Sequence, residues 1–344
     1  MRMGTRTFIF FIFLFSASFA STTSAAGSYD EAMAAYEEGE IEKAVSILEP
    51  MAQNGNIQAQ VTLGSIYFYD MEEEDEVKGL EWSRKAAEQG DSEGERLVGL
   101  AYEYGYGVKA NPLVAMKWFT KSAKQGNAEA MYDLGNMHQY GNGVKRDTST
   151  AMIWYIRSAR NEYPPAQYMV GKFYKRGYGV RRDYSMSAKY HKMAAEAKYT
   201  PSQVELGILY EEGKGVRKDY KEALRLYQSA AEIGYPSGQS HLGQMYLKGL
   251  GVKRDYQEAM NWFLLAAENN DDEACLQIGM MYEKGLGVKK DMAKALAWQK
   301  KAAEQGNREA NMNMAKKYFT GSGVDRDFGE AIKWFRKAGD CGCD

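Results

Sequence analysis

The sequence predicts an all-α solenoid of about nine helical hairpins, because three features of the chain share one period. The phrase Gly-x-Gly-Val begins at seven positions that are 36 residues apart, from Gly105 to Gly321. A single glycine recurs at the same step from Gly99 onward, and an aromatic or large apolar residue does so from Trp82 onward. Strict self-similarity at one period indicates a repeat array, whose units bury their apolar faces by stacking on one another.

Each repeat is predicted to hold a leading helix and a trailing helix, with the glycine phrase as the joint between them. In the repeat of residues 235–270, Gly249 ends the leading helix, because glycine accepts the left-handed conformation at a helix C-terminus. The second glycine of the phrase lets the chain turn tightly. Asp255 caps the trailing helix, and Glu258 completes a capping box, a pairing that Asp219 and Glu222 repeat. Glycines such as Gly99 let the helices approach closely.

The ends of the array depart from this pattern. Residues 29–54 predict a compact opening hairpin, and residues 56–90 keep both helices around the shorter joint "DMEEED", where Asp75 is expected to cap the next helix. Residues 341–344 read Cys-Gly-Cys-Asp. Because solenoids need polar ends, the last helix predicts either end-to-end pairing, assisted by a cysteine of this tail, or fraying of the last repeat.

Residues 1–26 predict a signal peptide and therefore an exported protein, periplasmic or secreted. Arg2 and Arg6 precede the apolar run "TFIFFIFLF", and small residues follow it, with cleavage after Ala20 or Ala26. An uncleaved membrane anchor is the alternative. The formal charge of −2 becomes −4 without the two arginines. Bulk attraction to nucleic acid is therefore not indicated.

The pattern "A..LG.MY..G.GV..D...A..W...AA..G" resembles the Sel1-like repeat family, a relative of the tetratricopeptide repeats. The resemblance covers eight repeats over residues 56–340, and the opening hairpin is similar to an ordinary tetratricopeptide unit. It implies a right-handed α/α superhelix that binds other proteins. Exported bacterial members resemble adaptors, host-interaction factors and envelope-assembly proteins. One cysteine-rich branch is linked to β-lactam binding or hydrolysis, but its pair of cysteines in each repeat is missing from this sequence.

The search for catalytic residues predicts no enzyme, no cofactor and no metal site. His138 and His191 stand where other repeats place packed aromatic residues, so both are interpreted as structural. His241 is expected to be exposed. No two histidines share a helix at metal-binding spacing, and no nucleophile or dinucleotide motif occurs. Cys275 lies within a predicted helix, and its role is left open, as are those of Cys341 and Cys343.

The leading helices predict a partner-binding surface, because in a solenoid they line the concave face. Positions on this face vary among the repeats, whereas the positions that hold the stack together do not. Exposed aromatic and apolar side chains are unexpected on a face that only meets solvent. The predicted partner-binding residues are Leu100, Tyr132, Tyr168, Lys172, Ile208, Met280, Met312 and Phe319.

The joints predict a second surface, which we call the basic edge. Five pairs of bases recur at the same period, namely Lys145, Arg146, Arg181, Arg182, Arg217, Lys218, Lys253, Arg254, Lys289 and Lys290. Such a strip suits an acidic protein, a glycan or a lipid headgroup. Alternatively, these bases are ordinary loop residues beside capping aspartates.

Together these features predict a non-catalytic scaffold that binds a protein or peptide in its concave groove. Binding of peptidoglycan or lipopolysaccharide through the basic edge is one alternative, and it leaves peripheral membrane contact open. A β-lactam-binding or β-lactam-hydrolysing enzyme is the other.

Overall fold

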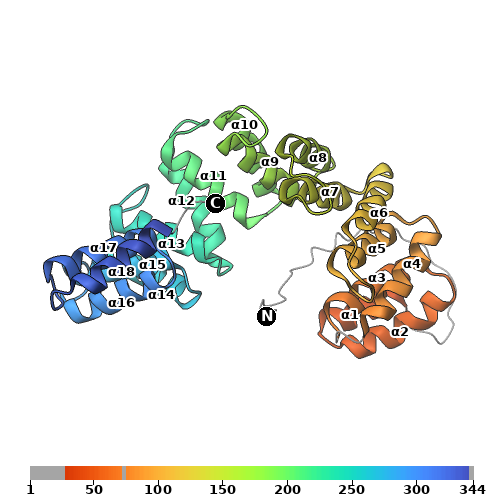
Figure 1. Cartoon of the computed structure of the whole chain (residues 1–344), viewed down its shortest axis with the longest axis horizontal. Helices are drawn as coiled ribbons and strands as arrows, with labels where there is room; N and C mark the ends of the chain where they lie inside the picture. The colour runs from red at the N-terminus through yellow and green to blue at the C-terminus, as the bar shows by residue number, and fades with distance from the viewer. Residues whose placement is uncertain (1–27, 72–74, 341–344) are drawn as a thin grey trace. The chain divides into compact units, whose positions relative to one another are not determined.

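The computed structural model describes residues 28–71 and 75–340. The predicted signal peptide, part of the acidic joint and the Cys-Gly-Cys-Asp tail with Cys341 and Cys343 lie outside the described residues. Within the described ranges every regular element is a helix, and successive helices pair into hairpins along the chain (Figure 1). The predicted all-α solenoid of nine hairpins is therefore confirmed.

The leading helices of the nine hairpins are α1 (Tyr29–Glu37), α3 (Ile57–Tyr69), α5 (Ser92–Tyr104), α7 (Ala128–Tyr140), α9 (Pro164–Arg176), α11 (Thr200–Glu212), α13 (Pro236–Lys248), α15 (Asp272–Lys284) and α17 (Arg308–Thr320). The trailing helices are α2 (Ile41–Gln53), α4 (Glu76–Glu88), α6 (Pro112–Lys124), α8 (Thr148–Arg160), α10 (Tyr184–Glu196), α12 (Tyr220–Glu232), α14 (Tyr256–Glu268), α16 (Met292–Glu304) and α18 (Phe328–Asp340).

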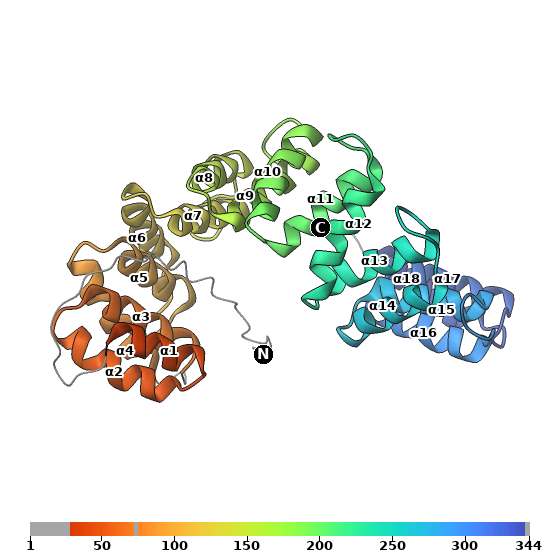
Figure 2. The same cartoon turned by 180° about the vertical axis from the view of Figure 1, so that it is seen from behind.

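The chain divides into two compact units, the first ending at Ala166 and the second beginning at Gln167. Both units keep the same order of hairpins, which can be followed from either side (Figures 1 and 2). The core of the first unit includes clusters around Leu63 and Phe119, and that of the second includes clusters around Tyr227 and Phe263. Each unit thus buries its apolar side chains between neighbouring hairpins, as a solenoid must.

The joints have the predicted conformation. Gly213 adopts φ +70° at the end of α11, and its N–H donates to the carbonyl of Leu209 at 2.9 Å. The second glycine, Gly215, adopts φ +72° and lies against the first residue of the preceding trailing helix, Tyr184. The second glycine therefore allows two successive hairpins to touch, in addition to turning the chain.

A backbone hydrogen bond closes each of seven joints. The N–H of the capping residue donates to a carbonyl near the end of the leading helix, over 2.7–3.0 Å. These pairs are Asn111 to Tyr102, Asp147 to His138, Asp183 to Tyr174, Asp219 to Tyr210, Asp255 to Tyr246, Asp291 to Tyr282 and Asp327 to Tyr318.

The predicted caps are only partly confirmed. Asp219 accepts hydrogen bonds from the N–H groups of Lys221 and Glu222, but the Glu222 carboxylate is held by Arg225 at 2.6 and 2.9 Å. The Glu222 carboxylate thus pairs with an exposed cation one turn away and does not complete the capping box. Asp75 makes no side-chain cap, because its backbone is helical where a capping residue is extended.

The recurring glycine of the leading helices makes room for a buried ring of the trailing helix. A Cβ atom at Gly99 would lie 2.6 Å from the Phe119 ring, and one at Gly207 would lie 2.5 Å from the Tyr227 ring. The predicted close approach of the helices is thus an approach of a ring to the backbone.

His191 occupies this ring position against Gly171 and is fully buried, which confirms its structural role. Burial lowers the pKa of His191 to about 4, and its Nδ1 lies 3.2 Å from the Ser202 hydroxyl. The expectation that His241 is exposed is wrong. Its ring stacks on Tyr227 at 4.8 Å, because α13 places this position beside the buried ring of the preceding hairpin.

Candidate interaction surfaces

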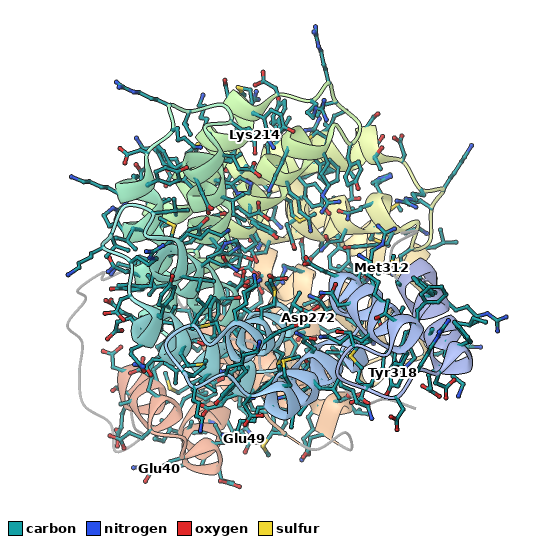
Figure 3. All side chains as sticks on the ribbon, turned by 90° about the vertical axis from the view of Figure 1, so that its left-hand side faces the viewer. Glu40, Glu49, Lys214, Asp272, Met312 and Tyr318 are labelled. Carbon is teal, nitrogen blue, oxygen red and sulfur yellow. The ribbon has the colours of Figure 1, made fainter. Side chains whose placement is uncertain are left out.

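The predicted partner-binding residues lie on the leading helices, and within each unit we call the side of these helices that carries them the leading-helix face. Six of them are half-buried, namely Tyr132, Tyr168, Lys172, Ile208, Met280 and Met312. Phe319, near the end of α17, is 52% exposed. Met312 also lies on α17, which carries the labelled Tyr318 (Figure 3).

Leu100 is the exception, and the expectation that it is available to a partner is wrong. Its side chain is 5% exposed and belongs to the same hydrophobic cluster as Phe68 and Phe119. Tyr69 and Tyr106 pack against that cluster, and their rings are 6.3 Å apart. A tyrosine at the end of α3 and one from the joint after α5 therefore add to the apolar packing in which Leu100 is buried.

Tyr132 and Tyr168 are held in place by rings on both sides. The Tyr132 ring lies 5.5 Å from Tyr155 and 5.5 Å from Tyr163. One repeat later, the Tyr168 ring lies 5.6 Å from His191 and 5.7 Å from Tyr199. Such fixed rings lose little conformational entropy when a partner covers them.

Three further tyrosines occupy the residue just before a leading helix, and sequence analysis missed them. Other repeats place Asp91, Asn127, Asp271 or Asn307 there, and each accepts a hydrogen bond from the helix backbone over 2.7–2.8 Å. Tyr163, Tyr199 and Tyr235 stand there instead, and neither Tyr199 nor Tyr235 forms a side-chain cap. The signal was in the sequence, because the period aligns these tyrosines with the capping residues.

In the second unit this substitution creates what we call the tyrosine cluster: Tyr168, Tyr199 and Tyr235, with Lys175 and Glu205. Lys175 Nζ lies 2.7 Å from Glu205 Oε2, and both side chains are about one-quarter exposed. Burial, helped by the negative charge of Glu205, raises the pKa of Tyr168 to about 12. The Tyr168 hydroxyl is therefore a neutral hydrogen-bond donor and acceptor near pH 7.

In the first unit the leading helices α5 and α7 carry a charged group, which we call the Arg96 cluster. The Arg96 guanidinium contacts Glu93 at 2.7 Å, Glu129 at 2.7 Å and Asp133 at 2.8 Å. One cation thus faces three carboxylates. Burial raises the pKa of Glu93 to about 7, because its charged form loses hydration that Arg96 only partly replaces.

The basic edge is exposed throughout, and four of its five pairs belong to the second unit. Nitrogen-tipped side chains project outward from the loops in the green part of the molecule (Figure 3). In three of the pairs the second base lies over the next aromatic ring, as Lys218 lies over the Tyr220 ring at 4.9 Å. Between Gly251 and the joint that holds Arg217 and Lys218 lies an open hollow of about 760 Å³.

The family model of the Sel1 repeat matches eight consecutive segments of the chain, at residues 57–91, 92–127, 128–163, 164–199, 200–235, 236–271, 272–307 and 308–343. The chain belongs to the Sel1 repeat family. Proteins built from Sel1 repeats are generally non-catalytic scaffolds for protein–protein interaction. No curated protein sequence matches this chain.

Two solved structures resemble this Sel1 repeat protein. One is c5321, a protective antigen present in uropathogenic Escherichia coli strains, with 35% sequence identity and a TM-score of 0.69. That match covers 87% of this chain but only 64% of c5321. The other is a Sel1 repeat protein from Oxalobacter formigenes, with 29% identity, a TM-score of 0.66, and coverage of 71% of this chain and 96% of the relative.

Reactive groups are scarce in these Sel1 repeats. Cys275 is fully buried in α15, and burial raises the pKa of its thiol. Residues 28–71 and 75–340 contain no group of three His, Cys, Asp or Glu side chains arranged to hold a metal ion. Across the same residues, no helix has the length and apolar character to cross a membrane.

Proposed function

We propose that this Sel1 repeat protein is an exported, non-catalytic scaffold that binds a protein or peptide on its leading-helix face. The observation that carries the proposal is the replacement of helix-capping residues by Tyr163, Tyr199 and Tyr235 in three consecutive repeats. A capping side chain contributes about 1 kcal/mol to the stability of a helix. Loss of this cap in exchange for a half-buried tyrosine indicates that the ring and hydroxyl have another function.

Tyrosine suits that purpose, because it contributes a large apolar area with only two rotatable bonds and carries a hydroxyl that fixes orientation. In the second unit Glu205 of the Lys175–Glu205 ion pair lies close enough to Tyr168 and Tyr235 to raise their pKa values, so a partner meets rings and charges together. In the first unit the Arg96 cluster carries an excess of negative charge. A segment bound there carries basic groups, since complementary charges favour association and exclude acidic competitors.

Two observations support the non-catalytic part of the proposal over a β-lactam enzyme. Cysteine nucleophiles act as thiolates at accessible positions with lowered pKa values. Cys275 has the opposite properties, because it is buried and its pKa is raised. The neutral imidazole of His191 is likewise buried against Gly171 and fills the place of an aromatic ring.

The proposal that the protein is exported rests on residues 1–26. The proposed location is the bacterial envelope or exterior, and host interaction is one proposed role. The charged, apolar and small-residue segments follow the order of a signal peptide. The similarity to c5321 supports this location, since a protective antigen is a protein that the host immune system meets. Fractionation of the native cell, with the processed N-terminus determined, tests it directly.

The partner can be found by photo-crosslinking in the native cell, with a photoreactive phenylalanine analogue at Tyr199. We expect a defined protein adduct at that position. The same analogue at Ile233, an exposed residue after α12, should give none. An adduct at both positions would indicate nonspecific contact and would count against the leading-helix face.

Once the partner is in hand, Tyr235→Asp separates binding from folding. Tyr235 precedes a helix whose third residue is Gly238, just as Asp91 precedes one whose third residue is Gly94. The aspartate should therefore restore a cap worth about 1 kcal/mol, which offsets the packing that the ring loses. We expect unfolding within about 1 kcal/mol of the parent, but binding weakened by about 1–3 kcal/mol, as measured by calorimetry.

The matched control is Tyr178→Ser, because Tyr178 is exposed in a joint and Ser322 occupies the same place in the last repeat. That variant should bind normally. If Tyr235→Asp also binds normally, the leading-helix face is not the site in this region.

A second candidate function, binding of an envelope polymer by the basic edge, is favoured by the hollow beside Arg217 and Lys218. Lys221, Tyr210 and Tyr220 also line it. Cations beside rings suit an acidic sugar polymer such as peptidoglycan or lipopolysaccharide. This candidate requires salt-sensitive binding to the purified polymer, abolished by the Arg217→Glu/Lys218→Glu double variant. In the protein-scaffold proposal, the same variant keeps its protein partner and changes mainly the association rate.

A further inference from the structure

The last hairpin, α17–α18, carries an apolar stripe that no described part of the chain covers. Phe328, Ile332 and Phe335 are 49%, 51% and 39% exposed, and Phe319 packs against Phe328 with ring centroids 5.4 Å apart. The three residues of α18 are spaced four and three apart, so they share one face of the helix. Large apolar side chains grouped in this way usually mark an interaction site.

The equivalent positions of earlier hairpins show what normally covers such a stripe. One repeat period at a time before Phe335 come the fully or almost fully buried Phe119, Tyr155, His191, Tyr227, Phe263 and Gln299. The positions equivalent to Ile332 include Met152 and Met260, which are also buried. Phe119 shares a hydrophobic cluster with Leu134 of the following hairpin, and Phe263 shares one with Ile278 of the following hairpin. The stripe is therefore a hairpin-stacking surface, and its natural occupant is another hairpin of the same kind.

We propose that the occupant is the α17–α18 hairpin of a second copy of this chain, so that two molecules pair tail to tail about a twofold axis. In such an arrangement the same patch meets itself, and each apolar side chain is covered by its counterpart. Twofold dimers are also the commonest closed assemblies of soluble proteins.

The first hairpin does not offer an equivalent occupant. Its exposed residues include Asp30, Glu31, Glu37 and Glu38, and all the large exposed hydrophobic side chains of the described residues come after it in the chain. Phe328, Ile332 and Phe335 have no polar group to offer these carboxylates, so stacking the stripe on this acidic end would remove their water without replacing it. An open head-to-tail filament is therefore disfavoured relative to a closed dimer.

The charges of the last hairpin permit self-association. Residues 319–339 contain four basic and three acidic side chains, so two copies repel each other little. Several bases are also engaged locally. Lys333 contacts Glu330 at 2.6 Å, Arg326 lies 4.4 Å from the centre of the Phe328 ring, and Lys337 lies 4.4 Å from the centre of the Trp334 ring.

The apolar area of the stripe sets the expected strength of dimerisation. An aromatic side chain buries about 150–250 Å², so four half-exposed residues offer roughly 400 Å² in each copy. A stable interface buries about 800 Å² per partner. The apolar stripe supplies about half of that area and the surrounding polar residues must supply the rest, which predicts a dimer that dissociates on dilution.

Sedimentation velocity of the processed chain, without the proposed signal peptide, in reducing buffer over about 1–300 µM tests the proposal. We expect a monomer–dimer equilibrium that Ile332→Glu weakens at least tenfold. The matched control is Ile153→Glu on α8, because Ile153 is equally exposed, at 52%, but is not part of the stripe. That variant should dimerise like the parent. Phe328→Lys is a second stripe variant in case Ile332→Glu perturbs α18, which hydrogen exchange of residues 308–340 would reveal.

The geometry is tested by crosslinking in a Cys341→Ser/Cys343→Ser background. Ile332→Cys should crosslink to the same residue of a second copy through a short bismaleimide. It should not crosslink to Ala34→Cys, an exposed site on the acidic first hairpin. A strictly monomeric chain, pairing that survives both stripe variants, an open series of oligomers, or crosslinks to Ala34→Cys would each overturn the proposal.

Discussion

Replacement of Gly215 by alanine should lower the stability of the second unit by about 3–5 kcal/mol, because two costs add. The residue adopts φ +72°, a conformation that side chains rarely accept. The new Cβ would also lie 2.6 Å from the Ser185 nitrogen and closer still to the Tyr184 carbonyl, so the two hairpins must move apart. Hydrogen exchange of residues 184–232, together with urea unfolding, would measure the loss.

Gly234→Ala separates the two costs. Gly234 adopts φ +80°, but a Cβ at that position would meet no atom within 4 Å. Its replacement should therefore cost only about 1 kcal/mol, which is the conformational part. Equal losses in the two variants would show that contact between successive hairpins at the joint contributes nothing, and that the second glycine serves only to turn the chain.

Most of the fold could be predicted because one period sets the helix boundaries from α5 onward. The left-handed glycine at Gly213 and the capping aspartate at Asp219 follow from local backbone chemistry and recur unchanged. Some of the predictions that failed depend on competition between neighbouring side chains. The Glu222 carboxylate is held by Arg225 instead of closing a capping box, and a period alone cannot indicate which partner wins.

The candidate surfaces were harder to predict, because variation among repeats does not distinguish an exposed position from one buried by a different neighbour. The position of Leu100 varies among the repeats, yet Leu100 is buried in a cluster against which Tyr69 and Tyr106 pack. The tyrosines before α11 and α13 were missed for another reason. Comparison of helix interiors overlooks the capping positions, where Tyr199 and Tyr235 replace the usual aspartate or asparagine.

Replacement of Arg96 by methionine should lower the stability of the first unit by about 3–5 kcal/mol near pH 7, since removal of one partner from a buried charge cluster leaves the others unpaired. The Arg96 side chain is only 11% exposed, and it is shared by Glu93, Glu129 and Asp133. Methionine keeps the apolar length of the side chain, so the loss reports chiefly on charge. Urea unfolding with hydrogen exchange of residues 92–140 would measure it.

The sign of the pH dependence gives this prediction a second test. Burial raises the pKa of Glu93 to about 7 from its ordinary 4.5 and also raises that of Asp133, so the folded state binds protons more tightly than the unfolded state. Their contribution to stability is therefore present at low pH and lost as the pH rises through about 7. Without Arg96 the carboxylate pKa values rise further. Between about pH 5 and 8 the variant should thus lose stability more steeply than the parent.

Arg225→Met is the control, because Arg225 also pairs with a glutamate at 2.6 Å but is 64% exposed. Solvent screens that pair, so its loss should cost less than about 1 kcal/mol and leave the pH profile unchanged. If Arg96→Met proves equally mild, the three carboxylates are hydrated or already neutral in the folded protein. The first unit would then present no fixed negative charge to a partner, and the expected basic segment would lose its reason to bind there.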